Sequence, residues 1–318
     1  MNHELGMLAF IVFSCFCLRF VVEIITTILI ADQKPAISAF IKLIAQALSA
    51  LVIVIQTKVT QGSLLYIGAT YSTVPVFVAF VASIYLYRSK YKDFTPRIKH
   101  VQLKYAKNLM NIGIKFFVIQ IAVVVMFTTD SMIITQLFGP EQVTVYSIAY
   151  KYFSVISMTF ALITSPLWSA YTEAWVKKDI VWIHNTIKKL KKIWFMYLIL
   201  GICMVVFSHL LFRLWVGEKM VIPFKLILFM ALYVIVGAYG AIYVNFINGT
   251  GKIQLQFYTA FFAAVLNIPL SVFFAKTLHL GPAGVILATL FCISYGPLIG
   301  PIQYKKIITG NAKGIWNK

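Results

Sequence analysis

Long uninterrupted apolar segments constrain this chain more than any other feature. Hydrophobic residues make up 61% of its 318 residues and charged residues only 12%, about half the charged share of a soluble domain. Nine segments are long enough for a helix that crosses the hydrocarbon core of a bilayer, which needs about 20 apolar residues. We therefore expect an all-α polytopic membrane protein. The predicted spans run roughly over residues 7–30, 36–57, 64–87, 109–138, 143–170, 193–214, 222–247, 255–276 and 281–304.

The net charge of +19 gathers between these spans. Nineteen Lys and Arg residues lie in the odd-numbered connections and the C-terminal tail, whereas the even-numbered connections hold only Lys58, Lys219 and Lys276. Cytoplasmic loops are enriched in basic residues, so the C-terminus is expected in the cytoplasm and the N-terminus outside. No basic face alternates with aromatic residues, so the expected partner is the lipid bilayer and not a nucleic acid.

The sequence offers no chemistry typical of an enzyme. The outward connections are too short for a catalytic domain, and the cytoplasmic ones lack a phosphate-cradling Gly-rich motif. The four cysteines lie inside apolar spans without metal-ligand spacing. We expect no catalytic residue, no metal and no cofactor.

A weak internal repeat organises the spans. Its two copies share topology, and parallel repeats are a transporter architecture with the substrate site between the halves. Three spans, the fourth to the sixth, lie between the two copies and directly precede the second, so three more are expected before the first. The prediction is a two-lobe transporter: residues 1–100 form the remnant of an N-terminal lobe with three helices, and residues 101–318 form a six-helix C-terminal lobe. The matching positions are Lys34 with Lys252, Gly62 with Gly281, and Ala69-Thr70 with Ala288-Thr289.

Four spans carry a polar stripe at helical spacing, and each stripe contains one base. Charges inside a bilayer are costly, so they face a cavity or a partner. The four bases are therefore candidate substrate-binding residues. The stripes are Cys15, Arg19, Glu23 and Thr26; Ser38, Lys42, Gln46 and Ser49; Asn108, Asn111 and Lys115; and Thr144, Ser147, Lys151, Ser154 and Ser165.

Structural roles remain open for three of these bases. Arg19 can pair with Glu23 one helical turn away. Lys42 and Lys115 can extend toward the lipid headgroups. Lys151 lies nearer the outer side of the membrane, where the enrichment of basic residues on the cytoplasmic side does not explain it.

Acidic residues within the spans are candidates for ion coupling. Asp130 has no basic neighbour one turn away, and Glu23 is the second candidate. Tyr146, Tyr150 and Tyr152, by contrast, are expected to be interface or packing residues. The stretch 180–194 has isoleucine, leucine and tryptophan at helical spacing with lysines off that stripe. It is interpreted either as an amphipathic helix on the cytoplasmic surface or as an extension of the next span.

One stretch resembles a known family. Residues 111–175 resemble the seventh and eighth helices of Wzx-type polysaccharide or O-antigen flippases, in the superfamily that includes the MATE exporters. The segment Ala31-Asp32-Gln33-Lys34 resembles the turn between the fourth and fifth helices, so the chain corresponds to helices four to twelve. The residues that carry the resemblance are Asp130, Ile133-Ile134, Gly139, Val143, Tyr146-Ser147, Lys151, Pro166-Leu167-Trp168 and Tyr171-Thr172-Glu173.

The resemblance implies a flippase for surface polysaccharide synthesis in the bacterial inner membrane. Its cargo would be an undecaprenyl-diphosphate-linked oligosaccharide, its energy source a gradient of H⁺ or Na⁺, and a candidate partner the polysaccharide polymerase machinery. A cationic cavity lined by Arg19, Lys42, Lys115 and Lys151 suits a diphosphate. The alternatives are a cation-coupled multidrug exporter of the same fold, a membrane-embedded glycan polymerase or ligase, and an inactive truncated remnant.

Overall fold

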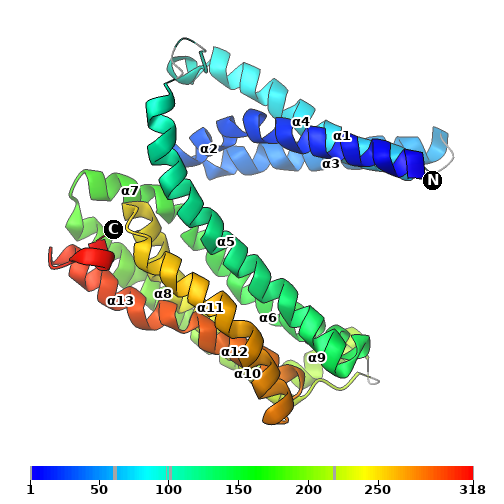
Figure 1. Ribbon diagram of the computed structural model, residues 1–318, viewed down its shortest axis with the longest axis vertical. Helices are drawn as coiled ribbons and strands as arrows, with labels where there is room; N and C mark the ends of the chain where they lie inside the picture. The colour runs from blue at the N-terminus through cyan, green and yellow to red at the C-terminus, as the bar shows by residue number, and fades with distance from the viewer. Residues whose placement is uncertain (1, 60–62, 98, 100–101, 218–219, 318) are drawn as a thin grey trace. The chain divides into compact units, whose positions relative to one another are not determined.

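The structure is a computed structural model that describes residues 2–59, 63–97, 99, 102–217 and 220–317. Lys219 and the expected boundary between residues 100 and 101 lie outside the described residues. The chain packs as two compact units, Met1–Gln102 and Leu103–Lys318 (Figure 1). The first contains α1 (Asn2–Val22), α2 (Ile24–Ala31), α3 (Pro35–Val59), α4 (Leu64–Arg88) and the 3-10 turn η1 (Lys92–Phe94).

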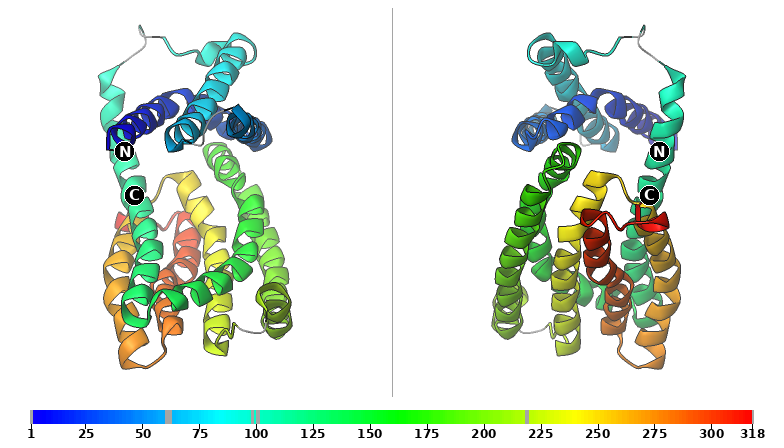
Figure 2. Two further views of the ribbon diagram at one scale, coloured as in Figure 1. Left: turned by 90° about the vertical axis from the view of Figure 1, so that its right-hand side faces the viewer. Right: turned by 90° about the vertical axis from the view of Figure 1, so that its left-hand side faces the viewer.

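The second unit is a larger helical bundle, whose helices run side by side in both views of Figure 2. Its elements are α5 (Leu103–Phe138), α6 (Pro140–Thr164), α7 (Leu167–Val176), α8 (Ile180–Val206), α9 (Ser208–Val216), α10 (Phe224–Thr250), α11 (Gln254–Val272), the π-helical η3 (Phe273–Thr277), α12 (Pro282–Ile293), α13 (Tyr295–Ile308) and η4 (Gly314–Asn317).

The predicted spans are confirmed as helices. Among the described residues, eight helical segments are long and apolar enough to cross a membrane, and the pair α8–α9 makes a ninth if its two parts count as one span. Several spans are interrupted: α6 gives way to α7 next to Pro166, and α12 to α13 at Ser294. The ninth span bends by 63° between Val206 and Ser208.

Two tight connections in the second unit depend on a glycine followed by a proline. Gly139 has φ +87° and Gly281 has φ +60°, backbone conformations that a side chain disfavours. The proline that follows each, Pro140 or Pro282, occupies the first turn of the next helix, where its missing N–H costs nothing. A single residue therefore separates α5 from α6.

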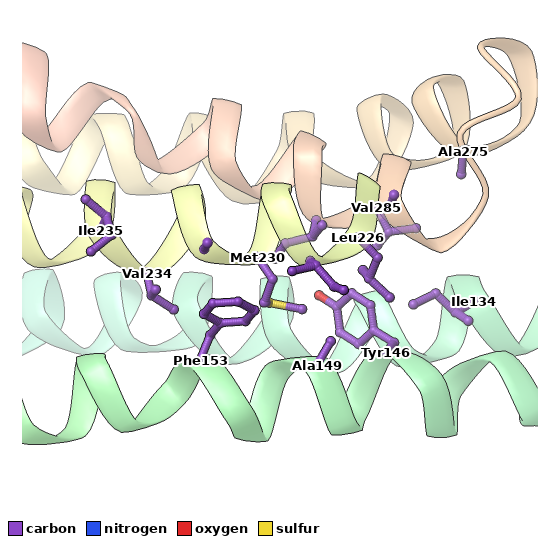
Figure 3. Close-up of a cluster of buried hydrophobic side chains, with 14 of the residues drawn as sticks. Ile134, Tyr146, Ala149, Phe153, Leu226, Met230, Val234, Ile235, Ala275 and Val285 are labelled. Atoms are coloured by element: carbon purple, nitrogen blue, oxygen red, sulfur yellow. The ribbon is translucent and has the colours of Figure 1, made fainter. Parts of the chain in front are cut away.

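The core of the second unit surrounds α10, which packs against α6, α7, α8, α12 and α13. Figure 3 shows Tyr146 and Phe153 of α6 beside Leu226 and Met230 of α10. All four side chains are buried. A second cluster lies toward the other end of α10, where Tyr243 and Phe246 meet residues of α7, α8 and α13.

The first unit is less buried. Helix α4 packs against both α1 and α3, and the polar residues of these contacts are small or paired. Ser83 donates a hydrogen bond to the carbonyl of Val22 at 3.0 Å, and Gln56 donates to Thr70 at 2.7 Å. Small polar residues allow close helix contact inside a membrane.

The stretch 180–194 forms one continuous helix with the following predicted span, as in the second of the two interpretations. Helix α8 runs without a break from Ile180 to Val206. Its apolar stripe, Ile183, Ile187 and Leu190, is buried against α7, α10 and α13. The protein core therefore takes the face that would otherwise have entered the bilayer.

Candidate functional site

A buried carboxylate is the most unusual polar feature of the second unit. Asp130 lies on α5 with 1% of its surface exposed. Helix α5 packs against α6, α11 and α12 at this site, and each of the three contributes a polar side chain. Gly139 follows Asp130 by nine positions, which places the carboxylate about 13 Å from the α5–α6 turn at 1.5 Å per residue.

Two hydroxyl groups contact the Asp130 carboxylate. The Tyr146 hydroxyl donates to Oδ2 at 2.8 Å. The Thr289 hydroxyl lies 3.3 Å from Oδ1 and 3.2 Å from Oδ2, and it accepts a hydrogen bond from Asn267 Nδ2 at 2.9 Å. Because Thr289 also lies 3.3 Å from the Val285 carbonyl, its one proton is shared between two acceptors.

Two oxygens next to this network are unsatisfied. Asn267 Oδ1 and Ser271 Oγ have no hydrogen-bond partner among the described residues, and both side chains are fully buried. A half-turn of the Asn267 amide exchanges its oxygen and nitrogen, so the side chain can offer Thr289 either an acceptor or a donor. A buried unsatisfied polar atom costs about 1–3 kcal/mol, which a bound ligand would recover.

The network is suited to a small hard cation or a proton. Within the described part of the chain no salt bridge reaches Asp130, and an ionised carboxylate in an apolar core needs a compensating charge. Carboxylate, hydroxyl and amide oxygens are ligands that hard cations prefer. No group of three His, Cys, Asp or Glu side chains with metal-binding geometry occurs in the described residues.

Among the predicted bases, Arg19 is neutralised within its own helix segment. Its Nε lies 2.7 Å from Glu23 Oε1, and both side chains are partly exposed. The structural pairing considered above is therefore present, and Glu23 lies in the break between α1 and α2. Lys42 lies exposed on α3, in the same unit.

Lys115 and Lys151 both belong to the second unit but lie far apart along it. Lys115 is 24 residues before Gly139 on α5, and Lys151 is 12 residues after it on α6. At 1.5 Å per residue these paths are about 36 Å and 18 Å, so the two backbones are at least about 18 Å apart whatever the angle between straight helices. That separation favours a cargo phosphate that contacts the two lysines one after the other over one that both lysines bind together.

Lys151 and the Asp130 network occupy different faces of α6. Tyr146 points into the core, and Lys151, five residues later, is rotated from it by about 140°. Lys151 is exposed and forms no ion pair within the described residues. One helix therefore contacts the buried carboxylate on one side and presents a base on the other.

Sequence reasoning missed most of the buried network. It assigned Tyr146 to packing, and it noted Thr289 only as a repeat position. Asn267 and Ser271 were not identified, although their spacing of four residues places them on one helix face. That spacing of two polar residues inside an apolar span was the available signal.

A second charged cluster lies at one end of the first unit. Asp32 accepts hydrogen bonds from the Lys34 ammonium and from the Tyr91 hydroxyl, the latter at 2.7 Å, and Lys90 lies 3.7 Å away. These contacts, led by the one from Lys34, hold the pKa of Asp32 at about 2. The same pairing raises the pKa of Lys34. The cluster fastens the turn between α2 and α3 to the segment after α4.

Comparison with known proteins identifies the fold and the family. A family model described as "Polysaccharide biosynthesis protein" matches residues 1–172, and the MatE model matches residues 116–273. No curated protein matches the chain.

Two solved structures resemble the chain at 14% identity. The first is an outward-facing multidrug resistance MATE family transporter of the MOP superfamily, with a TM-score of 0.71 over 89% of this chain and 65% of that one. The second is a crystal structure of a MATE point mutant, with a TM-score of 0.64 over 79% and 58%. The chain thus spans less than two thirds of each structure.

Proposed function

We infer the function from one premise: the chain belongs to the polysaccharide biosynthesis protein family, whose model matches residues 1–172. It is a multi-pass membrane protein, and we infer from the two family matches and the fold that it is a transporter of the MOP superfamily. We propose that its cargo is a lipid-diphosphate-linked oligosaccharide, which it moves from the cytoplasmic to the outer leaflet of the bacterial inner membrane. The family match over the first half of the chain carries this proposal.

The half-buried Lys115 and the exposed Lys151 support a cargo with a diphosphate. A diphosphate that leaves water needs compensating positive charge, and an ammonium supplies it as a point charge with several donors. The separation of Lys115 and Lys151 along the bundle suggests that the diphosphate meets them in sequence. Arg19 is the weakest member of the proposed set because Glu23 already neutralises it.

Ion coupling is assigned to the Asp130 network. A carboxylate that takes H⁺ or Na⁺ in one conformation and releases it in another couples a gradient to movement. Helix α6 offers the mechanical link, since Tyr146 contacts the carboxylate and Lys151 lies on the opposite side of the same helix.

A multidrug exporter is the second candidate. The MatE match over residues 116–273 and the fold of the two solved transporters favour it. Lys115 and Lys151 argue against it, because cationic drugs are attracted to acidic side chains and repelled by basic ones. A transport assay with an organic cation and with a lipid-linked oligosaccharide separates the two.

The test of the cargo uses a bacterial strain that lacks its own flippase. Lys151→Ala is expected to reduce surface polysaccharide at least tenfold at matched protein level, and Lys151→Arg to retain part of it, because Arg keeps the charge. The control is Lys188→Ala, which removes an exposed lysine from α8. Full export by a Lys115→Ala, Lys151→Ala double variant would remove both lysines from the proposed cargo path.

A further inference from the structure

The polar side chains of α11 continue well beyond the Asp130 network. Gln256, Thr259, Asn267 and Ser271 follow one another at spacings that keep them on one face of the helix. The position between them on this face is the small residue Ala263, which is buried against α5 and α12. The stripe therefore runs from the buried carboxylate toward the end of the bundle that carries Lys252.

A second stripe faces it from α12 and α13. Thr289, Cys292 and Tyr295 meet the first stripe at successive levels along the bundle. Asn267 donates a hydrogen bond to Thr289. Cys292 packs against Ala263, and Tyr295 borders the same small cavity as Thr259. Further along, Gln303 donates to the backbone carbonyls of Lys252 and Trp316, at 2.9 Å and 3.4 Å.

A small cavity lies where the two stripes approach the end of the bundle. Its volume is about 20 Å³, enough for one water. Its lining combines four polar side chains, Gln256, Thr259, Tyr295 and Gln303, with apolar side chains of α10, α11 and α13. Gln256 Oε1 is buried there without a hydrogen-bond partner among the described residues. The cavity thus offers an unsatisfied acceptor to a water or to a cation.

We propose that Gln256, Thr259, Tyr295 and Gln303 form a relay site through which a small cation, Na⁺ or H⁺, passes with water between the Asp130 network and the end of the bundle near Lys252. The inference rests on the proposed ion coupling at Asp130. A cation at a carboxylate with 1% exposure needs a polar route to water. The eleven residues from Asn267 to Gln256 correspond to about 16 Å of helix.

The middle of this route is closed in the present conformation. Met126, Ala263 and Cys292 pack together between the Asp130 network and the cavity. All three are buried, and they offer no oxygen to a cation. Separation of α11 from α12 at this level would join the two polar regions, so these three side chains are the gate of the relay.

The first test measures reactivity with a charged, water-soluble thiol reagent in membrane vesicles that expose the Lys252 end. Single cysteines at Gln256 and Thr259 are introduced after the four native cysteines are replaced by serine or alanine. The matched control is Phe262→Cys, on the same helix but on its exposed apolar face. The relay predicts at least tenfold faster labelling of Thr259→Cys than of the control. Equal rates at all three positions would refute it.

The second test keeps the native cysteines and measures exchange rates. The protein is reconstituted in liposomes. Gln256→Leu combined with Thr259→Val is expected to slow the exchange of bound cation with the solution at the Lys252 end at least tenfold. The equilibrium affinity for the cation should not change. Radioactive Na⁺ and a pH-sensitive dye distinguish the two cations. A change in affinity equal to the change in rate would indicate structural damage and contradict a relay.

Failure of the relay and failure of the proposed function give different results. Asp130→Asn abolishes cation binding if the coupling site is correct, whatever the state of the relay. Loss of binding in Asp130→Asn with unchanged exchange in the Gln256 and Thr259 variants would remove the relay alone. Cation binding that survives Asp130→Asn would remove the coupling site itself.

Discussion

Asp130 is held by one tyrosine and one threonine hydroxyl, and neither carries a positive charge. Its burial without a base is a cost that a purely structural core would avoid. We therefore expect Asp130→Asn to leave the fold intact and to raise its stability, by about 1–3 kcal/mol, while export falls at least tenfold. Thermal unfolding in detergent and surface polysaccharide measure the two effects. Asp93→Asn, an exposed carboxylate on η1, is the control; a destabilised Asp130→Asn protein would argue for a structural role.

Asp32 behaves differently because two lysines and a tyrosine surround it. Its pKa of about 2 lies below the ordinary value of 3.8, so its stabilising effect is present above about pH 4 and is lost as the pH falls through 2. The difference in unfolding temperature between the wild type and Asp32→Asn should be constant from pH 5 to pH 8 and should shrink below pH 4. A difference that is as large at pH 2 as at pH 7 would contradict this assignment.

At the scale of elements, the contact of α12 with η3 leaves no room for a side chain. A Cβ on Gly284 would lie 2.5 Å from the backbone nitrogen of Ala275. Gly284→Ala is therefore expected to destabilise the protein by about 1–3 kcal/mol. Gly113→Ala, on α5 with open space around it, should gain up to about 1 kcal/mol from helix propensity. Unfolding midpoints in one detergent compare the two; equal shifts would show that α12 can move away from η3.

The sequence predicted the helices well because span length and Gly-Pro turns are local properties. It predicted the buried network poorly because that network joins residues 159 positions apart, as in the pair Asp130 and Thr289. Helical spacing identified Asp130 and Lys151 as polar positions within apolar spans. It did not show that Tyr146 faces the carboxylate, since packing and hydrogen bonding place the same residue on the same face.

At the scale of the whole molecule, the distribution of basic residues predicts the orientation in the membrane. A reporter that is active only outside the cytoplasm should give no signal when fused after Lys318 or inserted after Lys178, and a strong signal when inserted after His279. A cytoplasmic reporter at the same three places provides the reverse pattern. A strong outside signal at the C-terminus would invert the orientation and, with it, the direction assigned to the cation relay.

The one-residue connection at Gly139 bears on how any conformational change would spread. A linker this short has no slack, so α5 and α6 can change their mutual angle only by deforming a residue already at φ +87°. The α5–α6 hairpin would then move as one rigid body, with Asp130 on α5 and with Tyr146 and Lys151 on α6. A pair of spectroscopic labels, one on α5 and one on α6, would therefore report a constant distance through a transport cycle. That distance would serve as an internal reference for the movements of the other helices.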